Sequence, residues 1–334
     1  MSRLADIPLS VLDLATVPRG SAPADAFRRS VAAAQRVESL GFNRFWIAEH
    51  HNLDGIASAA TTVLIGHVAD RTERIRVGAG GIMLPNHAPL AVAEQFGTLE
   101  ALHPGRIDLG LGRAPGTDGE TARALRARFG PGEPEFDVLL EELRHYLAPA
   151  EPGQRVRAVP GAGSDVPIWL LGSGHYSAQL AANLGLPFAF ASHFAPQNLY
   201  DALALYRRHF RPSRWLERPH AMVGVNVIAA ETAERAEYLA TSLQQRFLGM
   251  IRNRRGPLEP PVESLESVCD AREAAMVRNQ LAATAIGDVA GVRDWLGAFV
   301  EETGADELIV NTDTYELDDR LRSFDCLAEA WQGD

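Results

Sequence analysis

This chain of 334 residues contains no lysine. Its 32 residues of lysine plus arginine are all arginines. A lysine forms the Schiff base of pyridoxal-phosphate enzymes and lysine aldolases, and a lysine contacts the nucleotide phosphates in a P-loop. The sequence therefore excludes these classes of enzyme.

Cysteine and long apolar runs are also scarce. Cys269 and Cys326 are too few for a disulfide framework or a cysteine-rich zinc site. Residues 1–10 lack the apolar stretch of a signal peptide, and no uninterrupted apolar run is long enough to span a bilayer. The net charge of −11 argues against a general surface for nucleic acid or anionic membranes. We expect a cytoplasmic protein that binds neither.

Strand-like and helix-like segments alternate from end to end. The expected strands cover residues 7–12, 44–48, 75–83, 106–112, 167–171, 188–191, 222–228 and 307–311. The expected helices cover residues 25–40, 59–69, 90–102, 121–128, 136–147, 177–184, 197–210, 289–303 and 317–330. This alternation predicts parallel strands joined by right-handed crossovers.

About eight such units in one chain favour a (β/α)₈ TIM barrel over a doubly wound sheet or two small α/β domains. We expect a single domain over residues 1–334, because no linker divides the chain. Two insertions interrupt it: a Pro/Gly-rich loop at about 149–166, and a helical, mobile excursion at about 232–285 between the seventh and eighth strands.

The second strand ends in Glu49, His50, His51 and Asn52. In a barrel of this kind, the carboxyl ends of the strands carry the active residues. Histidine titrates near neutral pH, so paired histidines at this place indicate either proton transfer or metal binding. The segment alone leaves both open, together with a purely structural role for one histidine.

A second group of residues indicates a phosphate site. Leu171–Ser177 is a glycine-bearing turn from a strand into a helix, where backbone N–H groups and a hydroxyl bind anions. Arg113 follows the fourth strand, and its guanidinium can donate two parallel hydrogen bonds to the same phosphate. In the third strand, Gly80 and Gly81 indicate either the close approach of a flat ring or simple close packing.

With these motifs, the chain resembles the bacterial luciferase-like flavin monooxygenases over nearly its whole length. The segments that carry the resemblance are Trp46–Asn52, Val77–Pro85, His103–Arg113, Gly185–Pro187 and the stretch from Gly287 to Phe324. The run Leu84–Leu90 is typical of a bacterial subgroup whose members are mostly of unassigned substrate.

The resemblance implies a barrel that binds FMN or a deazaflavin at its mouth. His50 matches the catalytic histidine, and we expect Glu49 or His51 to hold it. Gly80–Gly81 falls where the family has a non-proline cis peptide beneath the flavin ring. The excursion before Ala285 falls where luciferase has its mobile loop, a candidate lid. The implied cofactor-binding residues are Gly80, Gly81, Asn86, Arg113, Ser173, Gly174, His175, Tyr176 and Ser177.

We therefore expect a two-component monooxygenase. A separate reductase supplies reduced FMN, which reacts with O₂ at C4a, and the hydroperoxide oxygenates a small organic substrate. Gly112 replaces a luciferase cysteine, and Gly174 and Ser177 replace its phosphate-binding serine and threonine, so light emission is not expected. The resemblance also implies a homodimer through helices 59–69 and 90–102.

Three alternatives remain. One is hydride transfer dependent on coenzyme F420 on the same fold. The second is a metal-dependent barrel hydrolase, using Glu49, His50, His51, His87 and His193. The third is a non-catalytic flavin-binding protein.

Overall fold

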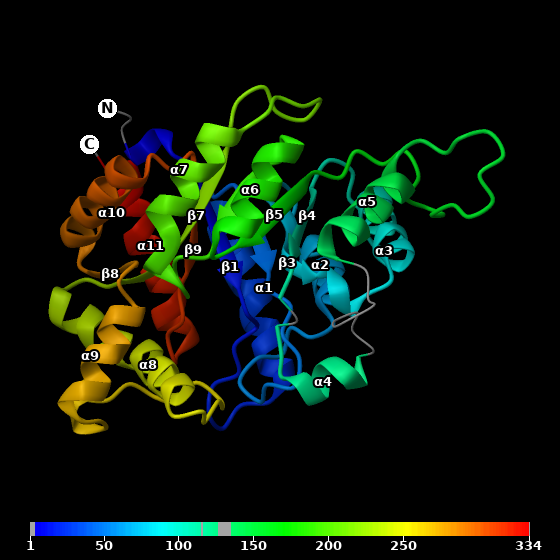
Figure 1. Ribbon diagram of the computed structural model, residues 1–334. Helices are drawn as coiled ribbons and strands as arrows, with labels where there is room; N and C mark the ends of the chain where they lie inside the picture. The colour runs from blue at the N-terminus through cyan, green and yellow to red at the C-terminus, as the bar shows by residue number, and fades with distance from the viewer. Residues whose placement is uncertain (1–3, 115, 126–134, 334) are drawn as a thin grey trace.

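A closed barrel of parallel strands forms the centre of the molecule (Figure 1). The computed structural model describes residues 4–114, 116–125 and 135–333. The strands in this part are β1 (Leu9–Asp13), β2 (Arg44–Ile47), β3 (Arg76–Met83), β4 (Ile107–Gly112), β5 (Ile168–Gly172), β6 (Phe188–Phe190), β7 (Ala221–Ala229), β8 (Thr284–Gly287) and β9 (Glu307–Asn311). They follow the order β6-β5-β4-β3-β2-β1-β9-β7-β8, and a further pairing of β6 with β7 closes a ring of eight. The predicted (β/α)₈ barrel is confirmed.

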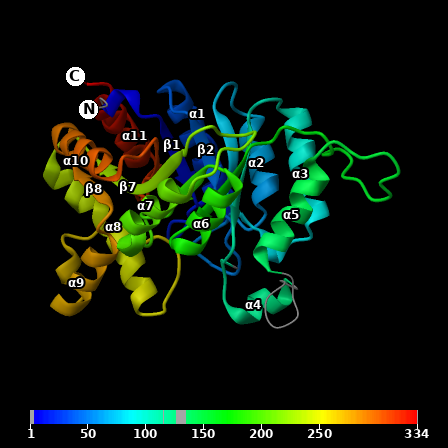
Figure 2. The ribbon, with the colours of Figure 1, turned by 45° about the horizontal axis from the view of Figure 1, so that its top comes forward.

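Helices surround this ring (Figure 2). They are α1 (Pro23–Ser39), α2 (Thr61–Ala69), α3 (Pro89–Leu102), α4 (Gly119–Ala124), α5 (Phe136–Leu147), α6 (His175–Leu184), α7 (Leu199–His209), α8 (Ala233–Ile251), α9 (Ala271–Gln280), α10 (Val289–Thr303) and α11 (Leu317–Gln332). Short 3-10 turns cover Leu4–Asp6, Leu84–Asn86, Pro196–Asn198 and Leu265–Ser267. Residues 126–128 of the helix expected at 121–128 lie outside the described residues. Within the described residues, we find no helix long and apolar enough to cross a bilayer.

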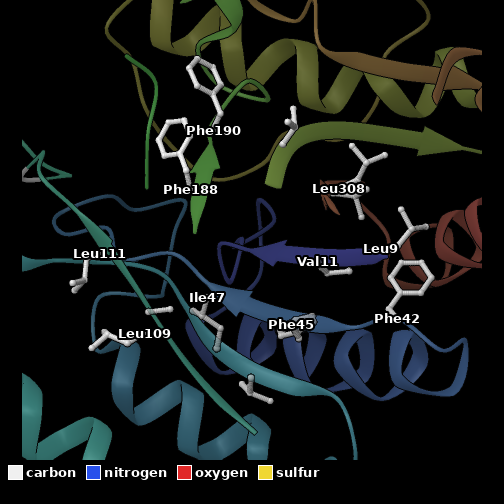
Figure 3. Close-up of a cluster of buried hydrophobic side chains, with 14 of the residues drawn as sticks. Leu9, Val11, Phe42, Phe45, Ile47, Leu109, Leu111, Phe188, Phe190 and Leu308 are labelled. Carbon is white, nitrogen blue, oxygen red and sulfur yellow. The ribbon is translucent and has the colours of Figure 1, made fainter. Parts of the chain in front are cut away.

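Successive side chains of each strand point to opposite faces of the barrel wall, so the core has two layers. Side chains that face outward, such as Val11, Phe45 and Ile47, pack against the helices (Figure 3). Their neighbours Leu12 and Trp46 face inward and fill the barrel. The inward layer also contains Trp169, Met222 and Ile309. This packed layer closes the barrel below its mouth and forms the floor of any site above it.

The C-terminal end of the excursion at 232–285 is not helical, as had been expected, but a strand. Residues expected to belong to a helical segment form the short strand β8, which pairs outside the ring with the last part of β7, from Asn226↔Thr284 to Ala229↔Gly287. This pairing is possible because β7 is long: its first residues pair with β9, and its last residues extend beyond the ring. An apolar cluster of its own holds the excursion, formed by Ile228, Leu239, Leu243, Phe247, Leu265 and Val277 among others.

The α8–α9 pair lies at the same end of the molecule as α4, whereas the first and last described residues lie at the opposite end (Figure 1). Segments that follow β1, β2 and β4 reach this end too. The excursion therefore covers the mouth of the barrel.

Candidate active site

A cavity of about 1100 Å³ opens at the carboxyl ends of the strands, beneath α8 and the segment that follows it. Apolar side chains of the inward layer, including Leu12, Trp46 and Ile309, form its floor. Its size is that of a large ligand site. The polar lining includes His50, Arg113, His193, Asn226, Asn311 and the turn from Gly172 to Ser177.

The turn between β5 and α6 leaves its backbone N–H groups available. Gly174 is the N-cap of α6, and its extended backbone (φ −158°) provides no side chain to cap the helix. The first N–H groups of a helix have no partner inside the helix, and its dipole favours an anion there. Ser177 lies directly behind the turn: a Cβ on Gly172 would lie 2.5 Å from Oγ of Ser177. The predicted residues Ser173, Gly174, His175, Tyr176 and Ser177 all line the cavity.

Arg113 lies next to this turn. Its guanidinium stacks on the ring of Tyr176, with 4.3 Å between the guanidinium carbon and the ring centroid. Within the described residues it forms no ion pair or hydrogen bond, so its charge is available to a ligand. A free arginine beside an uncapped helix start fits a phosphate group.

The two glycines of β3 allow close packing within the barrel and at the cavity. The Gly80–Gly81 peptide is cis, as the resemblance implied. A Cβ on Gly81 would lie 2.6 Å from the backbone oxygen of Gly110, so β3 and β4 pack more closely than another residue would allow. Gly80 lines the cavity, and a Cβ on it would lie 2.6 Å from Cδ1 of Leu12. The strand thus presents bare backbone to the cavity.

Glu49 lies behind the cavity wall, and its carboxylate is fully buried. Oε1 accepts hydrogen bonds from Nε2 of His51 (2.9 Å) and from the Asn86 amide (3.0 Å), and Oε2 accepts one from the backbone N–H of Met83 (3.0 Å). Nε2 of His87 lies 2.9 Å from both oxygens. Burial raises the pKa of Glu49, but the hydrogen bonds from His87, Asn86 and His51 outweigh it, so the net shift is downward.

The structure gives two side chains of this region partners that the sequence did not indicate. Asn86, expected at the cofactor, donates a hydrogen bond to Glu49. Glu49 or His51 was expected to hold His50, but these two bond each other. The reason is the alternation of an extended segment, which directs Trp46, Ala48 and His50 into the cavity and their neighbours behind its wall.

His50 is held by a backbone carbonyl. Its Nδ1 lies 3.3 Å from the oxygen of Gly116, which can only accept, so Nδ1 carries the proton and Nε2 the lone pair. Burial lowers the pKa of His50, and the nearby guanidinium groups of Arg246 and Arg255 lower it further, against the hydrogen bond to Gly116. His50 is therefore neutral at pH 7 and able to accept a proton at Nε2.

His193, which the sequence offered only as a ligand in the metal-hydrolase alternative, lines the cavity. It follows the end of β6. Nδ1 is buried and has no hydrogen-bond partner among the described residues, and Oδ1 of Asn311 in the same lining also lacks one. Burial, with a smaller contribution from the neighbouring His50, lowers the pKa of His193 to about 4. Both atoms are covered by protein, and a Cβ on Gly224 would lie 2.4 Å from Nδ1 of His193.

The metal-site hypothesis requires three or more ligating side chains around one point. In the part of the chain that the structure describes, no histidine, cysteine or carboxylate side chains are grouped in this way. His51 and His87 instead each form a hydrogen bond with Glu49.

The fold and the cavity define a (β/α)₈ barrel with a ligand site at the carboxyl ends of its strands. Residues 7–307 match the family described as "Luciferase-like monooxygenase". The chain belongs to this family of monooxygenases.

Relatives support the assignment along the whole chain. "Uncharacterized protein YvbT" of Bacillus subtilis is 55% identical over 98% of this chain and 97% of its own length. A "Luciferase-like monooxygenase" of Escherichia coli is 50% identical over 96% and 95%. The "N-acetyl-S-alkylcysteine monooxygenase" of Bacillus subtilis is 40% identical over 69% of this chain and 70% of its own.

Solved structures give the same fold. The structure of apo-MsnO8 is 33% identical and covers 99% of both chains with a TM-score of 0.87. The oxygenating constituent of 3,6-diketocamphane monooxygenase, in complex with FMN, is 17% identical, with a TM-score of 0.71 over 97% of this chain and 98% of its own. An F420-dependent secondary alcohol dehydrogenase is 14% identical, with a TM-score of 0.69 over 98% and 99%. The last two show the fold alone.

The Glu49 cluster generates a prediction about stability and pH. Glu49→Gln removes the charge that His51 and His87 bond, and we expect it to lower the free energy of unfolding by about 1–3 kcal/mol at pH 7. The folded-state pKa of Glu49 lies below its ordinary value of 4.5. The contribution of the carboxylate is therefore complete above that value and is lost as the pH falls through the lowered pKa.

Urea unfolding of the wild type and the variant between pH 7 and pH 3 measures this effect. The difference between the two proteins should shrink on acidification, whereas the exposed control Glu73→Gln should match the wild type throughout. A difference that is independent of pH would contradict the assignment.

Proposed function

We propose that this protein is an FMN-dependent monooxygenase of the two-component type, which receives reduced FMN from a separate reductase and oxygenates a small organic substrate with O₂. One observation carries the proposal. A turn with uncapped backbone N–H groups, beside an arginine that has no ion-pair partner among the described residues, lies at one side of a cavity whose lining also includes bare glycine backbone and a neutral histidine.

The residues present fit FMN. The N–H groups at the start of α6, the Ser177 hydroxyl and Arg113 would hold its phosphate. The bare backbone at Gly80 would accept the flat ring. When bound, reduced FMN supplies the electrons that activate O₂.

His50 is the proposed catalytic residue. With Nδ1 bound to the Gly116 carbonyl, the ring presents Nε2 as a base, and its lowered pKa keeps this atom unprotonated at pH 7. His50 would accept a proton during the reaction and return it later. Glu49 and His51 act behind the wall, where they position the segment. The segment after α8 covers the cavity and would exclude water.

The phosphate site alone does not distinguish FMN from coenzyme F420, since both carry a phosphate after a ribityl chain. Titration of the protein with each cofactor decides between them, and a preference for F420 would replace oxygenation by hydride transfer. Tight FMN binding without product in the presence of reductase, NADH and O₂ would instead indicate a flavin-binding protein. The relative that acts on N-acetyl-S-alkylcysteine makes N-acetyl-S-methylcysteine the first substrate to try.

Arg113→Ala tests the phosphate site. Loss of a charge-assisted hydrogen bond should raise the FMN dissociation constant by about 10- to 100-fold. Riboflavin lacks the phosphate, so its affinity should not change, and neither should FMN affinity in the exposed control Arg123→Ala. Quenching of flavin fluorescence measures both ligands. Equal losses for FMN and riboflavin would show that Arg113 does not contact the phosphate.

His50→Ala tests the acid–base role. We expect the rate of substrate oxygenation to fall by about 10²–10⁴-fold, with FMN affinity little changed. Because the pKa of His50 is lowered from 6.5, the wild-type rate should be constant above pH 6.5 and fall at lower pH, as Nε2 becomes protonated. Product formation by mass spectrometry is the readout, and the exposed His209→Ala is the control. Wild-type turnover in His50→Ala would refute the role.

A homodimer through α2 and α3 is part of the proposal. These helices expose Val63 and Leu102, which are 69% and 65% accessible. Large exposed apolar side chains on neighbouring helices fit an interface. Light scattering at micromolar concentration should give twice the chain mass of 36.2 kDa, and Val63→Arg should give the single mass. A monomeric wild type would rule this interface out.

A further inference from the structure

The cavity is strongly basic although the chain is acidic. Its described lining contains six arginines and one carboxylate, Glu259, whereas the whole chain carries a net charge of −11. The arginines are Arg19, Arg113, Arg246, Arg252, Arg254 and Arg255. Such a concentration of one charge in a concave site favours anionic ligands.

Three of these arginines are already neutralised by carboxylates. The ion pairs are Arg19 with Glu259, Arg246 with Asp313, and Arg252 with Glu273. Arg252 binds its partner through two hydrogen bonds, of 2.8 and 2.7 Å. Arg113 lies at the phosphate turn. Arg254 and Arg255 remain, and neither guanidinium forms an ion pair or a hydrogen bond within the described residues.

The segment that carries the two free arginines is fixed in place. At the end of α8, Asn253 adopts a left-handed conformation (φ 52°), and the backbone N–H of Arg254 donates to the oxygen of Gly249 at 2.7 Å. Further along, the N–H of Leu258 donates to the oxygen of Val17 (2.9 Å), and the N–H of Arg19 donates to the oxygen of Leu258 (2.8 Å). Arg254 and Arg255 are therefore held between α8 and the segment that follows β1.

This position is remote from the phosphate turn. The turn follows β5, and in the ring of eight strands β1 lies four positions from β5 in either direction. The free arginines and the phosphate site thus lie at opposite sides of the cavity. Arg255 and His50 line the same cavity. The phosphate of a cofactor bound at the turn would leave this second positive side without an anion.

We propose that Arg254 and Arg255 bind an anionic group of the substrate, a carboxylate or a sulfonate, and so orient the substrate toward His50. This inference deepens the proposed function and rests on it, since it assigns the second positive side of the cavity to the substrate. Guanidinium groups that line the cavity suit such a group, because each can donate paired hydrogen bonds to its oxygens. The acidic tail of coenzyme F420 offers the same chemistry, and the experiment separates the two sources.

The test uses matched acids and amides. The probes are N-acetyl-S-methylcysteine, 3-(methylthio)propanoate and phenylacetate, each with its carboxamide. Their binding to the full-length protein, with and without FMN, is measured by calorimetry. The wild type should bind at least one acid 10-fold or more tightly than its amide. The double variant Arg254→Gln/Arg255→Gln should lose this preference. Its affinity for the acid should fall, while its affinities for the amide and for FMN should stay unchanged.

Arg252→Gln is the control, since this arginine lines the same cavity but is paired with Glu273. It should keep the wild-type preference. The proposal is overturned if no acid is preferred by the wild type, or if the double variant retains the preference. It is also overturned if the double variant weakens F420 and leaves the acids unaffected. Preferential binding of acids by a protein that binds no FMN would support the anion site and refute the proposed function.

Discussion

A carboxylate buried away from water needs hydrogen-bond donors. The Glu49 carboxylate accepts hydrogen bonds from four donors. They come from the segment after β2 and from the end of β3 with the turn that follows it. The cluster therefore fixes two neighbouring strand ends relative to each other. Because extended backbone alternates, fixing Glu49 behind the wall also fixes His50 inside the cavity. The geometry of the site depends on this one buried charge.

The cavity adds a second electrostatic constraint. Its lining is basic at two opposite sides, the turn with Arg113 and the segment with Arg254 and Arg255, in a protein whose total charge is negative. Between these sides lie the apolar floor, the bare backbone at Gly80 and the neutral His50. A ligand with an anionic end thus finds a positive side at either end of the cavity. Charges at both sides, with a neutral base near one of them, are suited to a cofactor and a substrate that enter with opposite orientations.

Particular residues show why the fold was predictable and the site only partly so. Each strand of the barrel has its own apolar pattern, and the turn from β5 into α6 has its own glycines, so the barrel and this turn could be predicted. The short run Thr284–Gly287 was missed because it forms a strand only where the long β7 extends beyond the ring. Alternation placed His50 and His51 on opposite sides, and the same argument places Glu49 with His51. The partner of His50, the Gly116 oxygen, lies 66 residues away, and no local pattern identifies it.

The sequence by itself determined the order of the eight barrel strands, the absence of lysine chemistry, and the residues that the strand ends bring to the barrel mouth. These features depend on periodicity, on composition and on local turn chemistry, which neighbouring residues fix. Only the tertiary structure decided which side chains face the cavity, that Asn86 supports Glu49, that His193 belongs to the lining, and which arginines remain unpaired. Pairing and burial depend on contacts between distant segments, such as Arg246 with Asp313 and Leu258 with Val17. Those contacts exist only once the barrel has closed.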